Sequence, residues 1–568
     1  MNSSSTRVRR TRRAAIVQTA IESRRSRTGT GRPLPVAAYV LVLIMGLPIL
    51  WLGWAAIGSA LGGDNGLAAS MLPTALRETA VLMAWVGLTT GVLGLFSAWL
   101  VTHFDFPGRR ILEWALILPL AVPTYLAAYS YVEFLDFTGP VQQLVRLLTG
   151  ATTLQDYWFP TIKSPSGAAF VLSMVLYPYV YAACRTFFLM QSASIDSAAR
   201  TLGANGWRTF FSVTLPLSRP AIVVGVTLAM MEVVNDLGAV QYFGVNSLTA
   251  VIYTTWINRS NFGGAAQLAV TIVLVIALLI FAEQRARQNR VYATHRDSTV
   301  PAAHLRLGRG AGWLATAFCS TLLFLGFGLP FGELTFLASR SITQATLAMT
   351  AAAGLTTLEL AMSGAVVAVG IGLLAAKLSA PRSSGSARGA IRVATLGYAI
   401  PGTVLALGLL QPLGQADLWF NRLTMWLAQW RPGLILSGSI AALLYVYAIR
   451  FLALSHSTLD AAMRRRGDTM LDAGRVLGVK GFALLWRIDL PTLSPALLAA
   501  GTLVFVEIVK ELPATLLLRP LGVETLATLV YARANVSLFA EASLPALGIV
   551  VVGLIPVLLS THFSQRRS

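Results

Sequence analysis

The chain alternates between long apolar runs and short polar segments. Twelve of the runs reach the roughly 20 residues that a helix needs to cross about 30 Å of hydrocarbon. They lie at about 36–61, 78–102, 111–134, 167–191, 220–241, 264–283, 312–331, 352–379, 389–411, 433–454, 495–518 and 542–562. This pattern predicts an all-α polytopic membrane protein with about 12 transmembrane helices.

The distribution of basic residues predicts the orientation of these spans. An even number of spans places both termini on one side, and nine Lys and Arg residues lie in the first 34 positions alone. All the loops on the opposite side together also carry nine. By the positive-inside rule, both termini are cytoplasmic, and residues 1–34 form a basic, disordered tail that contacts anionic membrane lipid.

Composition agrees with a membrane location and excludes several classes of site. Hydrophobic residues make up 55% of the chain, charged residues 12%, and the mean hydropathy is +0.67. The net charge of +20 would suggest a nucleic-acid partner in a soluble protein, but here it lies in loops that set topology, so no nucleic acid is expected. The two cysteines and five histidines form no disulfide framework and no metal-ligand spacing. We therefore expect no catalytic, cofactor or metal site on this chain.

Two polar segments repeat one another at an offset of 275 positions. DSAARTLGANGWRTFFSVTLPLSRPAI starts at Asp196, and DAGRVLGVKGFALLWRIDLPTLSPAL starts at Asp472. Outside these segments Pro123 matches Pro401 at an offset of 278. A parallel duplication explains both, and it predicts two six-span units about a pseudo-two-fold axis along the membrane normal. The expected divisions are a first unit at 35–283 with its loop at 192–219, a cytoplasmic linker at 284–311, a second unit at 312–563 with its loop at 458–494, and a cytoplasmic tail at 564–568.

Each repeated segment predicts an elbow of two short helices. Apolar residues recur at helical spacing, and then Gly203 or Gly478 ends the first helix as a left-handed cap. A Leu-Pro pair follows, with its proline 13 positions after the glycine in both copies. Pro220 and Pro495 suit the first turn of the next spanning helix.

This repeated pattern resembles the cytoplasmic signature loop of binding-protein-dependent ABC transporter permeases. In that family the loop carries a coupling helix that sits in a groove of the ATP-binding subunit. The resemblance assigns ATPase coupling to the following positions: Ser197, Ala198, Ala199, Leu202, Gly203, Asp472, Ala473, Leu477 and Gly478. The first copy departs from the family at its acidic position, Ser197, and the second departs at Gly474, where the family has alanine.

The resemblance also implies a division of labour between subunits. None of the four lysines follows a glycine, so the chain has no Gly-Lys-Ser/Thr phosphate-binding loop. ATP and Mg are therefore expected on a separate ATP-binding subunit, in two copies that match the two loops, and this chain is expected to be no enzyme.

Charged and polar residues recur inside the span that follows each loop. They are Glu232, Asn235 and Asp236 in the first unit, and Glu507, Lys510 and Glu511 in the second. The i, i+3, i+4 spacing predicts that each trio shares one helix face. Such groups are costly at mid-membrane depth, so they either line the translocation pathway or hold helices together, with Lys510 paired to an acid.

The nature of the substrate is a further expectation. Carboxylates and the hydroxyls of Tyr242, Tyr253 and Tyr531 suit a hard cation. Residues 35–563 resemble the fused permeases of ferric iron importers, which implies an extracytoplasmic substrate-binding protein and a bacterial cytoplasmic (inner) membrane location. Related permeases for thiamine, phosphonate or polyamine share much of this pattern and remain alternatives.

A twelve-span secondary transporter of the major facilitator type is the competing class. DFPGRR, from Asp105, resembles the loop that this class has between its second and third spans. The corresponding loop of the second half, APRSSGSARG, has no copy, and a secondary carrier gives no reason for two matched elbows. The ABC permease is the better interpretation.

Overall fold

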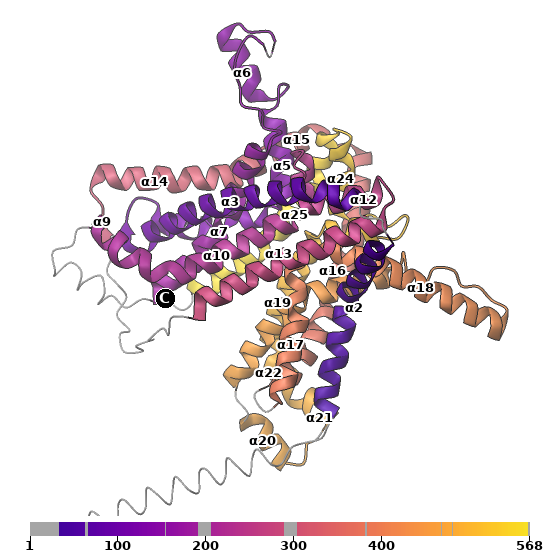
Figure 1. Cartoon of the computed structure of the whole chain (residues 1–568). Coiled ribbons are helices and arrows are strands. Elements are labelled where there is room, and N and C mark those ends of the chain that lie inside the picture. Colours follow the sequence, from indigo (N-terminus) through magenta and orange to yellow (C-terminus); the bar gives the residue numbers. More distant parts are fainter. Residues whose placement is uncertain are drawn as a thin grey trace, which may run out of the picture.

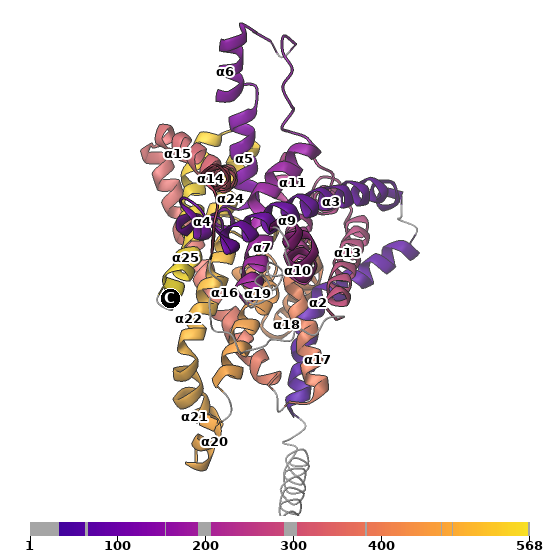
Figure 2. The same ribbon diagram turned by 90° about the vertical axis from the view of Figure 1, so that its left-hand side faces the viewer.

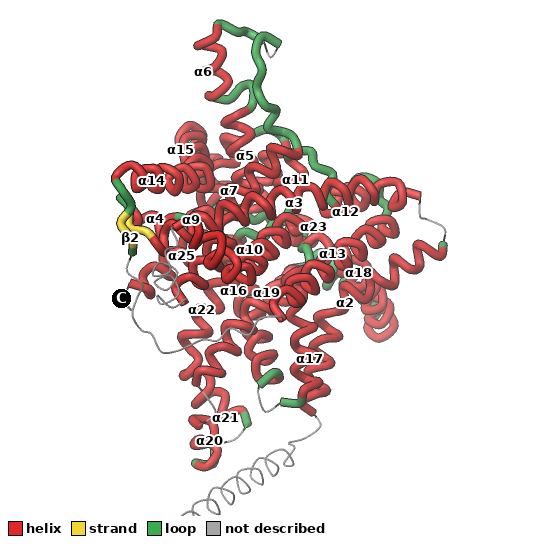
Figure 3. The backbone as a smooth tube through the Cα atoms, turned by 60° about the vertical axis from the view of Figure 1, so that its left-hand side comes forward, coloured by secondary structure: helices red, strands yellow, loops and turns green. Residues whose placement is uncertain are grey.

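The structure is a computed structural model that describes residues 33–62, 66–153, 155–190, 206–288, 304–380, 383–466, 469–479 and 481–565. Almost all of these residues lie in helices (Figure 3). Ten helices are long and apolar enough to cross a membrane, and the number reaches twelve if each of two bent helix pairs is one span. The predicted all-α, polytopic fold is confirmed.

The membrane helices of the two halves follow a common order, and the halves differ in detail. The first half consists of α2 (Pro33–Leu61), α3 (Gly66–His103), β1 (Phe104–Asp105), α4 (Arg109–Ala115), η1 (Leu118–Ala121), α5 (Thr124–Leu135), α6 (Pro140–Thr149), α7 (Pro165–Met190), α9 (Gly206–Thr209), η2 (Phe210–Thr214), α10 (Leu215–Asn235), α11 (Gly238–Tyr242), α12 (Leu248–Ile257) and α13 (Phe262–Gln288). The second half consists of β2 (Leu305–Arg306), α14 (Arg309–Leu323), η3 (Phe324–Gly328), α15 (Leu329–Ser341), α16 (Gln344–Leu378), α17 (Gly385–Ala394), η4 (Thr395–Ala399), α18 (Gly402–Ala428), α19 (Ile440–Arg466), α20 (Thr469–Val476), α21 (Phe482–Leu484), η5 (Leu485–Asp489), α22 (Leu490–Val509), α23 (Pro513–Leu518), α24 (Leu526–Asn535) and α25 (Phe539–Gln565). The strand follows the second span in the first half but precedes the first span in the second half, and α5 with α6 corresponds to the single helix α18.

The third predicted span of each half is broken rather than continuous. The chain bends by 94° between η1 and α5 and by 109° between η4 and α18. Both breaks fall at a proline, Pro123 or Pro401, whose preceding residue has an extended backbone. The proline ring disfavours the helical conformation of that preceding residue, so the apolar runs at 111–134 and 389–411 do not form straight helices.

The fifth predicted span of each half is also interrupted. α10 ends at Asn235 and α11 begins at Gly238, while α22 ends at Val509 and α23 begins at Pro513. The runs at 220–241 and 495–518 were expected to be single helices, and this expectation was wrong. The breaks matter because the charged trios of the sequence lie on them.

Three π-helical segments occur among the described residues, and each directly precedes a Leu-Pro pair. η2, η3 and η5 end just before Leu215-Pro216, Leu329-Pro330 and Leu490-Pro491. A proline lacks the backbone N–H and clashes with the carbonyl four residues earlier, which lies within each π segment. The local helix therefore widens by one residue instead of breaking.

Two bundles diverge from a shared centre. In Figure 1 α3, α7, α10 and α13 run to one side, whereas α16, α19 and α22 run downward. The ends that carry the elbows, α9 in one bundle and α20 with α21 in the other, lie far apart, and Figure 2 shows α20 again at the lower end. α6 projects from the opposite end of the molecule (Figures 1 and 2).

Each half holds the other through its first long helix. α2 packs on α17 and α18 of the second half as well as on α13, and α15 packs on α5 of the first half as well as on α25. Trp51 of α2 donates a hydrogen bond to Gln411 Oε1 at 3.2 Å, and Tyr131 of α5 donates one to the Leu325 carbonyl at 2.7 Å. The two halves are therefore interlocked.

Candidate functional site

The second elbow lies at the end of its bundle farthest from the shared centre. α20 ends in a left-handed cap, because Gly478 has φ +84° and the Val479 N–H donates to the Gly474 carbonyl at 3.0 Å. The apolar side chains of Val476 and Leu477 are 86% and 82% exposed there. The described part of the elbow thus presents an uncovered apolar tip, with Asp472 and Ala473 on the helix just before it.

One side of α20 carries an exposed ion pair, and the other side packs against the following segment of the chain. Asp472 pairs with Arg475 at 3.1 Å, with about half of each side chain exposed. Gly474 is buried, and a Cβ at this position would come within 2.2 Å of Ile488 Cδ1. This contact gives a physical reason for glycine where the family pattern has alanine.

The first elbow is described only from Gly206 onward, as α9 and η2. The predicted coupling residues of this copy lie outside the described residues: Ser197, Ala198, Ala199, Leu202 and Gly203. Their assignment stays a prediction.

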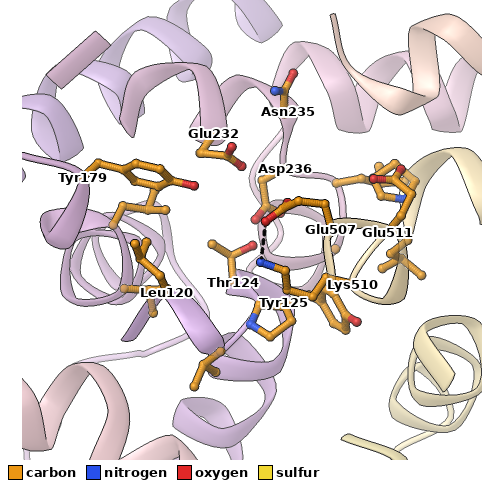
Figure 4. Close-up of a pocket in the computed structure, with 18 of the residues that line it drawn as sticks. Leu120, Thr124, Tyr125, Tyr179, Glu232, Asn235, Asp236, Glu507, Lys510 and Glu511 are labelled. Atoms are coloured by element: carbon orange, nitrogen blue, oxygen red, sulfur yellow. Dashed lines mark hydrogen bonds and ion pairs between the residues drawn. The ribbon is translucent and has the colours of Figure 1, made fainter. Parts of the chain in front are cut away.

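A polar cavity of about 110 Å³ lies where the two halves meet, and both charged trios line it (Figure 4). The first half contributes Glu232, Asn235 and Asp236, and the second contributes Glu507, Lys510 and Glu511. The structure therefore brings together six side chains that the sequence separates by about 275 positions.

The cavity depends on the helix breaks. Asp236 follows the last residue of α10, and its Oδ1 accepts a hydrogen bond from the Ala239 N–H of α11 at 2.8 Å. In the same way, Glu511 Oε1 accepts one from the Ala514 N–H of α23 at 3.0 Å. The expectation that each trio shares one helix face was wrong for these two acids, which begin the next short helix instead.

Two ion pairs lie on the second-half side of the cavity. Lys510 Nζ is 2.8 Å from Glu507 Oε1, and Arg450 Nε of α19 is 3.2 Å from Glu511 Oε2. The corresponding first-half position to Arg450 is Val175, so the basic groups belong to the second half. The cavity lining counts four carboxylates against two cations.

Four buried polar atoms of the lining have no hydrogen-bond partner among the residues that the structure describes. They are Asn235 Oδ1, Asp236 Oδ2, Arg450 Nη1 and the Tyr125 hydroxyl. In Figure 4 Tyr179 and Glu232 point toward one another across one side of the cavity. Buried polar groups are normally satisfied, so these atoms require water or a polar ligand.

Two lining residues, Arg450 and Tyr179, and a glycine that packs against the lining, Gly402, were missed from the sequence. Arg450 is an isolated charge in an apolar run, about 15 Å from the start of α19 at 1.5 Å per residue, which was a readable signal. Tyr179 gave no signal in the sequence. Gly402 follows the break at Pro401, and a Cβ there would come within 2.5 Å of Arg450 Nη1 and 2.7 Å of Glu511 Oε1. Among the residues that the structure describes, no three His, Cys, Asp or Glu side chains are placed to hold a metal ion.

A duplicated set of broken membrane helices around a charged cavity defines a membrane permease. The family described as "Binding-protein-dependent transport system inner membrane component" matches residues 90–291. The molybdenum transport system permease protein ModB of Escherichia coli (strain K12) is 31% identical over 205 residues, 35% of this chain and 86% of that protein. The chain belongs to this family.

Two further relatives extend the likeness. The Fe(3+)-transport system permease protein FbpB 2 of Haemophilus influenzae is 24% identical over 507 residues, which cover 86% of this chain and 90% of that protein. The sulfate transport system permease protein CysT of Escherichia coli (strain K12) is 26% identical over 275 residues, 46% of this chain and 94% of that protein. The predicted resemblance to ferric iron permeases is confirmed, and the chain is a multi-pass inner-membrane permease subunit of an ABC importer. Its family implies an ATPase and a substrate-binding protein as partners.

Proposed function

We propose that this permease imports ferric iron, which an extracytoplasmic binding protein delivers to it. The charge of the central cavity carries the proposal, because four carboxylates outnumber two cations there. Carboxylate, phenol and hydroxyl oxygens are ligands that hard cations prefer, and Tyr125, Tyr179 and Thr124 add such oxygens to the lining. The relative with the longest alignment given above is named as an Fe(3+) permease.

The proposal also covers the translocation pathway and the ATP hydrolysis that powers transport. The six residues of the two trios line the route of the cargo, and ATP with Mg is hydrolysed on two copies of a partner subunit. Closure of that partner moves α20 and its first-half counterpart toward one another, which switches the cavity from inward to outward access. Both termini are cytoplasmic in this arrangement.

Uptake measured with three labelled cargoes tests the iron assignment. The chain, its ATPase and its binding protein are reconstituted in vesicles, and radiolabelled ferric iron, molybdate and sulfate are offered separately. We expect ATP-dependent uptake of iron alone. Uptake of an oxyanion without iron would overturn the iron assignment while leaving an ABC importer.

An oxyanion importer is the second candidate, and two observations favour it. Arg450 Nη1 is buried without a partner, and Lys510 lines the same cavity. Relatives named for molybdenum and sulfate transport match parts of the chain. Arg450→Gln combined with Glu511→Gln separates the candidates without leaving a buried acid unpaired, since the double variant should abolish uptake of an anion but not of a cation.

A further inference from the structure

A buried ionic cluster lies where the second elbow joins the membrane bundle. Asp489, the last residue of η5, has only 3% of its surface exposed. Its Oδ2 is 2.7 Å from Lys377 Nζ, and its Oδ1 is 2.8 Å from Arg466 Nη1. Lys377 belongs to the last turn of α16 and Arg466 is the last residue of α19. One carboxylate therefore connects the start of α22 to the ends of two other long helices.

The elbow rests directly on this cluster. Gly474 of α20 lies against the terminal methyl group of Ile488, the residue before Asp489, and α20 packs on η5. Arg466 Nη1 also donates a hydrogen bond to Thr492 Oγ1 at 2.9 Å, which adds a second link to the first turn of α22. A displacement of α20 therefore acts on the segment that carries Asp489.

Within the described ranges of the chain, the first half shows no ionic cluster at the corresponding place. Thr214 occupies the position of Asp489, and its buried hydroxyl has no hydrogen-bond partner. Trp99 occupies the position of Lys377 and packs on Phe210 with 4.6 Å between ring centroids. The same joint is thus aromatic in one half and ionic in the other.

We propose that Asp489 is the positioning residue that transmits movement of α20 to α16 and α19. This inference rests on the proposed ATP-driven coupling and assigns it a specific contact. Asp489 links three helices that are separate in the chain, namely α16, α19 and α22. An ion pair within a single helix would not connect it to any other helix. Removing the carboxylate leaves the largely buried Arg466 without its acid partner, which is costly, and frees both helix ends from the elbow.

The experiment compares uptake with ATP hydrolysis in the complete reconstituted importer. In Asp489→Asn we expect assembly with the ATPase and ATP hydrolysis to persist, while uptake per ATP hydrolysed falls about tenfold or more. Asp489→Glu keeps the charge and should restore most of this ratio. A merely structural role would lower hydrolysis, assembly and uptake together.

Two matched controls isolate the cluster. Asp460→Asn removes the same charge from the Arg464–Asp460 pair, which lies within α19 alone. Thr214→Val removes the unpartnered hydroxyl at the equivalent first-half position. Both should leave uptake per ATP unchanged.

A distance measurement reads the transmission itself. In the wild-type protein, the distance between spin labels on α20 and on the cytoplasmic end of α16 should stay constant through the ATP cycle. In Asp489→Asn this distance should vary during the cycle. The proposal would be overturned if Asp489→Asn left both the distance between the labels and the uptake per ATP hydrolysed unchanged. It would also be overturned if Asp489→Asn and Asp489→Glu both failed to assemble with the ATPase. If the wild-type importer did not couple ATP hydrolysis to uptake, the proposed function would be overturned instead. Uptake by the wild-type importer is therefore measured first.

Discussion

At the scale of single residues, the unusual feature of this protein is where its intramembrane acids lie. Asp236 and Glu511 each accept a backbone N–H of a short helix that starts at the cavity. Acids at such helix starts are favoured by the unpaired N–H groups and the helix dipole. In the part of the chain that the structure describes, neither Glu232 nor Glu507 has a side chain that accepts a backbone N–H in this way, and both are the better candidates for transient contact with cargo.

Neutralising those two acids together should impair transport. In Glu232→Gln with Glu507→Gln we expect uptake to fall by about tenfold, the effect of roughly 1.4 kcal/mol of lost interaction. Lys510 also loses its partner at 2.8 Å. Initial uptake rates measure the change, and co-purification with the ATPase shows that docking is intact.

Glu524→Gln is the control for this pair of changes, since Glu524 is 43% exposed in the loop between α23 and α24, beside Arg519. It should transport normally. Normal kinetics in the double variant would mean that the acids only hold helices together.

Gly474 offers a second test, because an added Cβ would meet the terminal methyl group of Ile488, which must then shift. Gly474→Ala should destabilise the elbow by about 1 kcal/mol as the Ile488 side chain is forced toward a less favourable rotamer. Thermal unfolding in detergent measures this effect. Gly501→Ala in α22 is the matched change, since no atom lies within 4 Å of its Cβ, and it should be neutral or stabilising by about 0.5–1 kcal/mol.

The sequence predicted much of the cavity, but not all of it. The five ionisable positions of the two trios were readable because such groups are rare in apolar runs, and the duplication placed them, together with Asn235, in equivalent spans. Gly402 was not readable, because its role depends on Arg450 and Glu511, which approach it only in the folded chain. Hydropathy also carries no information about which acids end up beyond a helix end.

At the scale of elements, proline decides how the spans depart from straight helices. At Pro123 and Pro401 the chain turns sharply, whereas before Pro216 and Pro491 it only widens into a π segment. The apolar runs predicted where the spans lie but not these breaks, because average hydropathy is insensitive to a missing N–H. The prolines themselves were the available signal.

The cap of α20 gives a prediction at this scale. Gly478 has φ +84°, a conformation that Asn tolerates better than Ala. Gly478→Ala should cost about 1 kcal/mol and lower ATP-coupled uptake, while Gly478→Asn should retain more of both. Uptake per ATP hydrolysed and thermal unfolding are the measurements. Equal behaviour of the two variants would exclude backbone strain as the cause.

At the scale of the whole molecule, the two halves form one unit. α2 packs on α17 and α18, and α15 packs on α5, so each half supplies a helix to the other. The short parallel pairing of Phe104–Asp105 with Leu305–Arg306 adds a further link between them. The duplication predicted two equivalent units but not this exchange, because self-similarity within a sequence does not say which copy a helix contacts.

A cut between the halves tests the interlock. A protease site inserted between residues 289 and 303 should leave two fragments that remain together after cleavage. Size-exclusion chromatography in mild detergent, with an affinity tag on one fragment, measures their association. Separation of the fragments at that step is the result that would refute the interlock.

The exchange of first helices has a consequence for how the protein is made. α2 is the earliest described helix to be synthesised, but its partners α17 and α18 begin only at residues 385 and 402. At roughly 5–20 residues per second, α2 waits on the order of 20–60 s before these partners exist. During that time lipid must cover the surface that protein covers later. The second half therefore completes the first, and a chain that stops after residue 288 would leave α2 with an uncovered face.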